Sequence, residues 1–490
     1  MAGFVTKIIK SGLGVFTSRI FGMVRDICIA GFFGANGATD AFVAAFAVPN
    51  LFRAFFAEGA LASVFVPFLS DKLTMEGEQK ASVYLSSLIT VISSVVLILT
   101  VLVMAFPDIV TYIFLPGYKD DPAVSSLMPA MVSVLMPYLF FVTVCSLLTC
   151  YLNLKGSFFV PNSSTAFLNI AMIAGAFMGY HHGSDILYVC YGVFIGGVAQ
   201  FFFILLYAYR FGFRFSLRGG YDRRVNEVFH YAVPSLAGVG ISQINFMIGR
   251  AAASFLATGS ISYLYYSNRL FQFPMGLFTI AVGTVVMAEI SKANSSGDTA
   301  VRNSLIDKAI NSIMLVMLPS AAGLIVLAEP IISLVYGRMN FLASDTAATA
   351  ADLQMYSLGL VFYSFIAVFS RVFYSDKDIK TPLKGAFVGL VVNVVMIAAL
   401  MKFMGHSGIA LASSVAAAAT FFYLYTRVRD YRYLFGAVFM KASASSAIMV
   451  IGSYIMLSAG AGTVVNIVIS AVLYFLALYL MKTNIRSVLR

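Results

Sequence analysis

The chain has 490 residues, of which 60% are hydrophobic and only 11% are charged, and its mean hydropathy is +0.90. This composition excludes an ordinary soluble domain and indicates a membrane protein with many crossings. The net charge of +11 does not indicate nucleic-acid binding, because the basic residues lie in short loops between apolar runs and not on one solvated face.

Apolar runs long enough to cross a bilayer recur from one end of the chain to the other. Because the hydrocarbon core holds no water to satisfy free backbone groups, these runs are expected to be α-helices. Alternation over about ten residues, which is typical of a membrane barrel, is not the pattern of this sequence. We predict fourteen spans, at residues 9–33, 39–69, 82–106, 127–154, 160–180, 186–209, 228–257, 261–290, 305–328, 352–374, 382–404, 409–428, 435–459 and 464–481.

The first run is predicted to be a retained helix. Lys7 and Lys10 resemble the start of a signal peptide, but the run continues through two arginines to Phe33 without a cleavage pattern.

With the N-terminus inside, 23 Lys and Arg residues fall on the cytoplasmic side and 3 outside. The positive-inside rule therefore predicts an even number of crossings with both termini in the cytoplasm.

The longest basic linker, "RFGFRFSLRGGYDRR" at residues 210–224, follows the sixth span. An ordinary positive-inside loop would also explain its charge. A weak repeat supports a division there, because "VPNSSTAFLNIAMI" and "TPLKGAFVGLVVNVVMI" each open a helix with Pro and carry a mid-helix Asn. The predicted segments are an N-lobe at 1–212, a cytoplasmic linker at 213–226, a C-lobe at 227–430 and a final helix pair at 431–490.

The final helix pair differs from the other spans in its lack of charge. Residues 442–481 contain no Asp, Glu, Lys, Arg or His. This hairpin is expected to face lipid or to line a lipid-like groove. The predicted fold is an all-α polytopic membrane protein, with two six-helix lobes around a central cavity and a C-terminal hairpin.

Sequence motifs for catalysis are absent. No HExxH, P-loop or GxSxG motif occurs, and the four histidines do not have metal-like spacing. The four cysteines all fall within predicted helices, where small apolar packing is their expected role. The short loops leave no room for a soluble catalytic domain, so a transporter is favoured over an enzyme.

Six arginines lie within the predicted spans: Arg19, Arg25, Arg53, Arg250, Arg269 and Arg371. Insertion scales put a central Arg facing lipid at about 2.5–3.5 kcal/mol, so four near the midplane would cost about 10–14 kcal/mol. These side chains are therefore expected to face a protein interior. Arg371 is near the inner end of its span and is expected to extend to the interface, whereas Arg250 has no obvious partner.

Helical spacing places several of these charges on common faces. Arg19 and Asp26 are seven residues apart, which is two turns along one face, and Arg25 lies on the same side. One stripe of the first span is therefore polar. In the second span, Arg53 is near the middle, Asp40 lies toward the outer end, and Glu58 lies inward of Arg53.

Arg269 lies in the outer half of the eighth span, so basic groups from both halves can converge on one cavity. Arginine is always charged and has a planar fork suited to phosphate, so converging arginines indicate an anionic ligand. Structural alternatives stay open, because buried charges usually pair. Arg25 could pair with Asp26 or Asp40, and Arg53 could pair with Glu58.

Three stretches carry a family resemblance. The segment "SRIFGMVRDICIAGFFGANGATDAFVAAFAVPNLFRAFFAEGALASVFVPFLSD", at residues 18–71, resembles the first two helices of MurJ-type lipid II flippases. These belong to the multidrug/oligosaccharidyl-lipid/polysaccharide exporter superfamily. The stretches "YLYYSNRLFQFPMG" from Tyr263 and "YSDKDIKTPLK" from Tyr374 resemble the same family. With the predicted helices, the resemblance covers essentially the whole chain.

The resemblance implies a V-shaped cavity between two lobes and a groove for a lipid tail along the last two helices. It implies alternating-access transport of lipid II, an undecaprenyl-pyrophosphate-linked peptidoglycan precursor, from the inner to the outer leaflet of the bacterial cytoplasmic membrane. Its expected partners are lipid II and membrane lipids, with no nucleic acid. No cofactor is expected, and both membrane potential and an ion gradient stay open as the driving force.

The resemblance also implies site residues. Arg19, Arg25 and Arg269 match arginines expected to hold the pyrophosphate, and Arg53 matches a further functional arginine. The supporting cavity residues are Asp26, Asp40, Asn50, Glu58, Asn268 and Gln272.

The chain departs from the family pattern at three of its positions. Many members have Lys where this chain has Ala47, and acids where it has Asn268 and Gln272. Fewer carboxylates near Arg269 are expected to leave it less neutralised, which would offset the missing Lys.

Three alternatives stay open. The substrate could be another lipid-linked oligosaccharide or a drug, although export of a cation would favour an acidic cavity. A membrane-embedded glycan-lipid enzyme would need a catalytic carboxylate pair or a metal motif on a large outer loop. A scaffolding role with cell-wall synthesis proteins as partners is a third possibility.

Overall fold

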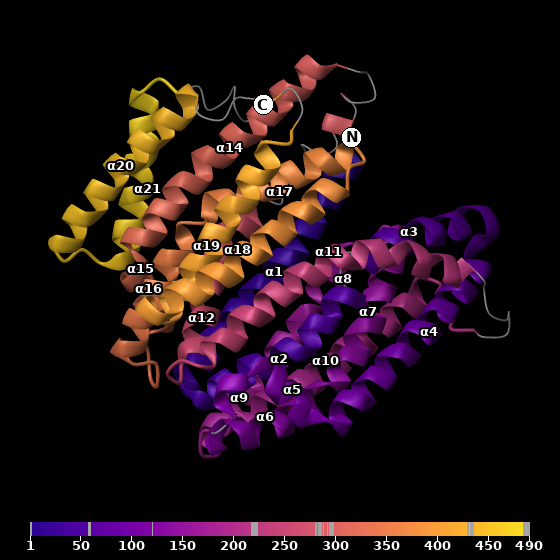
Figure 1. Ribbon diagram of the computed structural model, residues 1–490. Helices are drawn as coiled ribbons and strands as arrows, with labels where there is room; N and C mark the ends of the chain where they lie inside the picture. The colour runs from indigo at the N-terminus through magenta and orange to yellow at the C-terminus, as the bar shows by residue number, and fades with distance from the viewer. Residues whose placement is uncertain are drawn as a thin grey trace. The chain divides into compact units, whose positions relative to one another are not determined.

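A computed structural model of the protein describes residues 2–56, 60–119, 121–216, 224–279, 298–428 and 436–483, together with positions 282, 287, 289–291, 293 and 431. All regular secondary structure within these residues is helical (Figure 1). The expectation of an all-α protein is confirmed. The chain divides into two compact units, which are Met1–Gly259 with Met339–Phe341, and Ser260–Arg338 with Leu342–Arg490.

The elements of the first unit are α1 (Ala2–Phe33), α2 (Gly37–Phe56), α3 (Ala60–Asp71), η1 (Lys72–Glu76), α4 (Gly77–Ala105), α5 (Pro107–Phe114), η2 (Pro116–Tyr118), α6 (Pro122–Leu135), α7 (Pro137–Leu154), α8 (Phe159–Ser163), α9 (Thr165–His181), α10 (Leu187–Arg210) and α11 (Arg224–Ala253). Helix α1 packs on α8 and α9, α10 packs on α7 and α9, and α4 packs along α7. Helix α11 packs on α2 and α3 and so belongs to this unit. The two units thus divide at Gly259, whereas the predicted linker between the lobes ends at residue 226. The arrangement of six helices per lobe stays a prediction.

The elements of the second unit are α12 (Ser260–Pro274), η3 (Met275–Thr279), α14 (Thr299–Val326), α15 (Ala328–Tyr336), α16 (Ala343–Ser357), α17 (Leu360–Ser375), α18 (Lys380–Met404), α19 (His406–Tyr425), α20 (Ala437–Ser458) and α21 (Thr463–Leu480). Helices α18 and α19 pack together, and α12 packs on α16. Helix α14 packs against both α17 and α20.

Among the described residues, eight helices are long and apolar enough to cross a membrane, or nine if the bent pair α16 and α17 forms one span. The chain is therefore a membrane protein with multiple apolar helices, and the count of fourteen spans stays a prediction. Five of the six arginines within predicted spans lie in the predicted spans at 9–33, 39–69, 228–257 and 261–290.

A π-helical segment, η3, continues α12 beyond Pro274. Its last residue, Thr279, donates from Oγ1 to Ser364 Oγ on α17 at 3.0 Å. The half-buried Arg371 of α17 donates from Nη1 to the Thr279 carbonyl at 3.5 Å. This contact helps to hold the end of η3, and the extension of Arg371 to the interface stays a prediction. Such π segments are frequent near functional sites, and this one follows the helix that carries Arg269.

Three polar side chains of the C-terminal hairpin bond to one another between its two helices. Asn466 on α21 is fully buried and donates from Nδ2 to the Ser453 carbonyl on α20 at 3.1 Å. Ser470 Oγ donates to Asn466 Oδ1 at 3.0 Å, and the hydroxyls of Ser453 and Ser470 are hydrogen-bonded. Hydrogen bonds between helices stabilise packing where lipid supplies no partner. The outer faces, with Ile451 and Tyr454 exposed, are apolar, as the sequence predicted.

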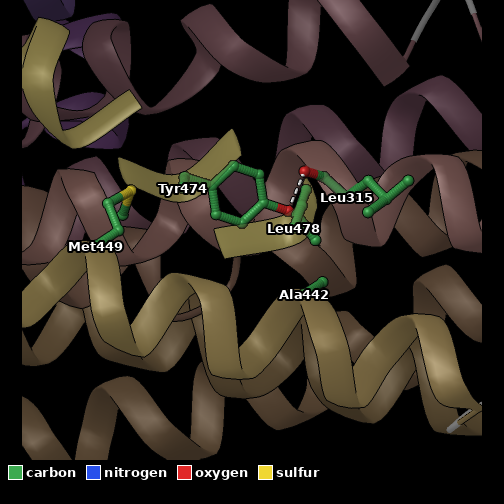
Figure 2. Close-up of a cluster of buried hydrophobic side chains, with 5 residues drawn as sticks. All are labelled: Leu315, Ala442, Met449, Tyr474 and Leu478. Atoms are coloured by element: carbon green, nitrogen blue, oxygen red, sulfur yellow. Dashed lines mark hydrogen bonds between the residues drawn. The ribbon is translucent and has the colours of Figure 1, made fainter. Parts of the chain in front are cut away.

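Tyr474 joins this hairpin to α14. Figure 2 shows its hydroxyl donating to the Leu315 carbonyl, at 2.7 Å, within a buried cluster. Pro319 stands four residues after Leu315 and has no N–H, so the Leu315 carbonyl cannot make the usual helical hydrogen bond to it. Tyr474 therefore satisfies a carbonyl that the proline left without its helical donor.

Replacing Tyr474 with phenylalanine is expected to lower the free energy of unfolding by about 1–3 kcal/mol, because a buried carbonyl loses its donor. Tyr479→Phe is the matched control, since Tyr479 is on the same helix but 77% exposed. Thermal unfolding of both purified variants in detergent is the measurement. Equal midpoints for the two would contradict the role assigned to the Tyr474 hydroxyl.

Candidate functional site

Arg25 and Asp26 form a buried ion pair on α1. Their exposed fractions are 6% and 3%. Arg25 donates to Asp26 Oδ1 from Nε at 2.9 Å and from Nη2 at 2.7 Å. The structure thus contains the pairing of Arg25 with Asp26 that the sequence left as one alternative.

Asn169 of α9 completes the surroundings of this pair. Arg25 donates from Nη1 to Asn169 Oδ1 at 3.0 Å, and Asn169 donates from Nδ2 to the Ser18 carbonyl at 3.3 Å. These bonds hold α1 against α9. In this conformation the guanidinium of Arg25 is directed at acceptors of the protein itself.

Arg19 is in a different environment on the same helix. Its side chain is half-buried, and its neighbours Phe16 and Ile20 are each 48% exposed. Within the described ranges, no hydrogen-bond acceptor or carboxylate pairs with Arg19. Arg19 is therefore a cation without a protein acceptor in these ranges.

Asp40 lies at the start of α2 and is fully buried. Its Oδ2 accepts from the Tyr118 hydroxyl at 2.6 Å and from the Gly259 backbone N–H at 2.7 Å. The resemblance implied a place in the cavity for Asp40. The observed bonds join α2, η2 and the turn after α11 within the first unit, and a place for Asp40 in the cavity stays a prediction.

Arg53 and Asn50 are one turn apart on α2, and both are half-buried. Arg53 donates from Nε to Asn50 Oδ1 at 3.1 Å, and Asn50 donates from Nδ2 to the Phe46 carbonyl at 2.8 Å. Asn50 therefore orients the Arg53 guanidinium. Glu58 lies outside the described residues, so its pairing with Arg53 stays a prediction.

Arg269 occupies an exposed face of α12 in the second unit. It donates from Nη2 to the Tyr265 hydroxyl at 3.1 Å, and its Cζ is 5.0 Å from the centroid of that ring. Gln272 Nε2 donates to Asn268 Oδ1 on the same face. Because these two amides are neutral, they do not neutralise Arg269 as the acids that the resemblance implies at these positions would.

The stretch from Tyr374, which carries part of the resemblance, caps α18. Asp378 accepts from the Thr381 backbone N–H at 3.0 Å and from the Thr381 hydroxyl at 2.6 Å. Burial opposes the ionisation of Asp378, but these hydrogen bonds and the positive charge of Lys384 outweigh it and hold its pKa below the ordinary value. Asp376 beside it pairs with Arg302 of α14 at 2.7 Å, so this stretch also links α14 to α17.

Sequence reasoning missed two partners of the site arginines. Asn169 was visible only as a lone amide in an apolar run, and Tyr265 as a tyrosine one turn before Arg269. The structure brings Arg25 to Asp26 and Asn169, Arg53 to Asn50, and Arg269 to Tyr265. The convergence of all four arginines on one cavity stays a prediction. In the part of the chain that the structure describes, no group of three or more His, Cys, Asp or Glu side chains could hold a metal ion.

Comparison with known proteins identifies the family. A family model described as "Lipid II flippase MurJ" matches residues 29–482. The chain belongs to the lipid II flippase MurJ family. The resemblance inferred from the three stretches is therefore confirmed, and because the family is one of transporters, the chain is a transporter and not an enzyme.

Individual members of the family resemble the chain over most of its length. A probable lipid II flippase MurJ of Haemophilus influenzae is 34% identical over 424 residues, which is 83% of each chain. Its counterpart from Thermotoga maritima is 32% identical over 483 residues, covering 98% of this chain and 97% of that one.

Solved structures agree with the sequence comparisons. A lipid II flippase MurJ in an inward closed conformation superposes with a TM-score of 0.84 at 29% identity, covering 98% of this chain and all of the other. An inward-facing multidrug MATE transporter has a TM-score of 0.69 at 13% identity, over 86% of this chain and 98% of that one. The second match shows a shared fold only.

Proposed function

We propose that this protein moves lipid II from the inner to the outer leaflet of the bacterial cytoplasmic membrane. The observation that carries the proposal is the match of the MurJ family model to residues 29–482. The arginines within the predicted spans support an anionic substrate, because several guanidinium groups at membrane depth are costly unless they bind an anion or an acid. Both termini are proposed to lie in the cytoplasm.

The proposed substrate site uses the arginines that the structure leaves accessible. Arg19 has no acceptor within the described ranges, Asn50 orients Arg53, and Tyr265 holds Arg269 on an exposed face. These guanidinium groups would replace water around the pyrophosphate and so lower the penalty that otherwise blocks flipping. No bond is made or broken.

Arg25 is proposed to have a positioning role first. It already donates to Asp26 and Asn169, so it would have to leave at least one of them to reach a phosphate. Its bonds hold α1 in register with α9 and therefore set the position of Arg19 on the same helix. Asp40 is proposed to act in the same indirect way, through its bonds to Tyr118 and Gly259.

Alternating access is the proposed mechanism, with two six-helix lobes rocking about the substrate. Solved transporters of similar fold include both inward-facing and outward-facing conformations. The prenyl tail would stay in lipid along α20 and α21, whose outer faces carry exposed apolar side chains. Asn466, Ser453 and Ser470 of that hairpin are bonded to one another, so they do not oppose contact with a hydrocarbon chain.

The test is a flipping assay with purified protein in liposomes that contain labelled lipid II. Arg269→Ala is expected to slow leaflet exchange about 10- to 100-fold, because a hydrogen bond to a charged group is worth about 1.5–3 kcal/mol. Stability should change by less than about 0.5 kcal/mol, since the side chain is exposed. Lys402→Ala, an exposed cation on α18, is the matched control and should transport normally.

Two results would count against the proposal. Absence of lipid II exchange with the unmodified protein would overturn the flippase function itself. Equal exchange by Arg269→Ala and Lys402→Ala would leave the function intact and remove Arg269 from the site.

A further inference from the structure

A groove in the first unit is lined by none of the proposed substrate residues. It has a volume of about 400 Å³ and runs between α4, α7 and α10, with the segment after α10 closing one end. Its lining is mostly apolar and includes Leu97 of α4, Phe140 of α7, and Phe201 and Tyr209 of α10. All three helices lie within candidate membrane spans, so the groove is open to the acyl chains of the bilayer.

The closed end of the groove is a fixed wall. Phe213 lines it and is fully buried. The backbone N–H groups of Arg214 and Ser216 donate to the hydroxyls of Ser82 and Ser86 on α4, at 3.4 and 3.1 Å. These bonds hold the segment across the end of α4, so the groove is already formed without a ligand.

The same end carries positive charge. Arg214 lies between two residues that line the groove, Phe213 and Phe215. Its Nη1 donates to the Tyr209 and Phe213 carbonyls at 2.6 and 2.9 Å, and its Cζ is 5.6 Å from the centroid of the Tyr209 ring. The guanidinium is thereby held at this end of the groove while remaining exposed.

The cations near this end form no salt bridge with any residue whose side chain is described. Among residues with described side chains, no carboxylate pairs with Arg214 or with the exposed Arg210 that ends α10. Lys155, by contrast, pairs with Glu78. Farther along the groove, the hydroxyl of Ser93 is buried, and no described residue forms a hydrogen bond with it. An apolar slot thus ends beside the exposed guanidinium of Arg214.

We infer that this groove binds one anionic diacyl phospholipid, with its phosphate at Arg214 and an acyl chain between α4, α7 and α10. The lining of α4 extends from Ile89 to Leu97, which is about 12 Å of helix. That length approaches half of a hydrocarbon core of about 30 Å, as expected for a lipid of one leaflet. Guanidinium groups bind phosphate oxygens well. A zwitterionic lipid would bind Arg214 less favourably, because its own cationic headgroup competes with Arg214 for the phosphate.

The chain contains no tryptophan, so one introduced tryptophan reports on a single place. Phe201→Trp places it in the groove. Phe202→Trp is the matched control, since Phe202 is the next residue on α10, is 54% exposed and does not line the groove. The full chain would be reconstituted in phosphatidylcholine with increasing amounts of phosphatidylglycerol brominated on its acyl chains, which quenches nearby tryptophan.

Quenching of Phe201→Trp is expected to reach half its maximum at a mole fraction of brominated phosphatidylglycerol about fivefold below that needed for Phe202→Trp. A preference of this size is what about one cation near an anionic lipid would produce. Brominated phosphatidylcholine should quench both variants alike. Arg214→Gln, added to Phe201→Trp, should remove the fivefold preference, and Arg214→Lys should retain most of it.

The inference is overturned if the two tryptophans titrate identically with brominated phosphatidylglycerol. It is also overturned if zwitterionic and anionic lipids quench Phe201→Trp equally, or if Arg214→Gln leaves the preference unchanged. The comparison of Phe201→Trp with Phe202→Trp needs no change at Arg214, so it stands even where Arg214→Gln fails to fold.

Discussion

Replacing Arg25 with alanine is expected to lower the free energy of unfolding by about 3–5 kcal/mol and to abolish lipid II transport. The physical reason is that Asp26, 3% exposed, would stay buried without the guanidinium that donates to it twice. The bond to Asn169 on α9 would be lost as well. Denaturant unfolding in detergent and the liposome flipping assay measure the two effects separately.

The double variant Arg25→Ala with Asp26→Ala separates a structural role from a substrate role. Replacing both members of a buried ion pair is often close to neutral, so most of the stability should return. If transport returns with it, Arg25 acts only by positioning α1. If stability returns while transport stays absent, Arg25 also contacts the substrate.

Arg19→Ala is the control on the same helix. Its side chain has no acceptor within the described ranges, so stability should change by less than about 1 kcal/mol, whereas transport should fall strongly. An Arg25→Ala protein as stable as the unmodified protein would contradict the buried ion pair between Arg25 and Asp26.

Replacing Asp40 with alanine is expected to cost about 3 kcal/mol of stability. Asp40 is fully buried, and its Oδ2 accepts from the Tyr118 hydroxyl and the Gly259 N–H. Hydrogen bonds to a charged group contribute about 1.5–3 kcal/mol each, less the cost of burying the charge. Transport should fall in proportion to the folded fraction.

A double-mutant cycle tests this assignment. Tyr118→Phe removes one of the two bonds and is expected to cost about 1.5 kcal/mol. Combined with Asp40→Ala it should add almost nothing, because its partner is already gone. Asp108→Ala, an exposed aspartate on α5, should cost less than about 1 kcal/mol. Additive losses for Asp40 and Tyr118 would mean that their hydrogen bond contributes no coupling.

Several elements could be placed from the sequence because their signal is local. The predicted span 382–404 corresponds to α18 at Lys380–Met404, and 464–481 corresponds to α21 at Thr463–Leu480. Each is a continuous apolar run bounded by turn residues, and a helix is the structure that satisfies its own backbone in lipid. The family could likewise be recognised from three stretches, each of which is contiguous in the sequence.

The candidate site was predicted less completely. Spacing placed Arg19, Arg25 and Asp26 on one side of the first helix, and it correctly identified Asp26 as a possible partner for Arg25. It did not separate Arg19, which has no acceptor within the described ranges, from Arg25, which is buried. The two differ in what packs against them, and periodicity carries no information on that.

The sequence by itself determined the helical class, the cost of intramembrane arginine and the family, since each depends on composition or on contiguous residues. Only the tertiary structure decided that Asn169, 144 residues away, binds Arg25, and that Tyr118 binds Asp40. Likewise, Tyr474 reaches a carbonyl that Pro319 leaves without its helical donor, across 159 residues of chain. A helical period defines which face is polar, but the partner on that face depends on which distant helix packs there.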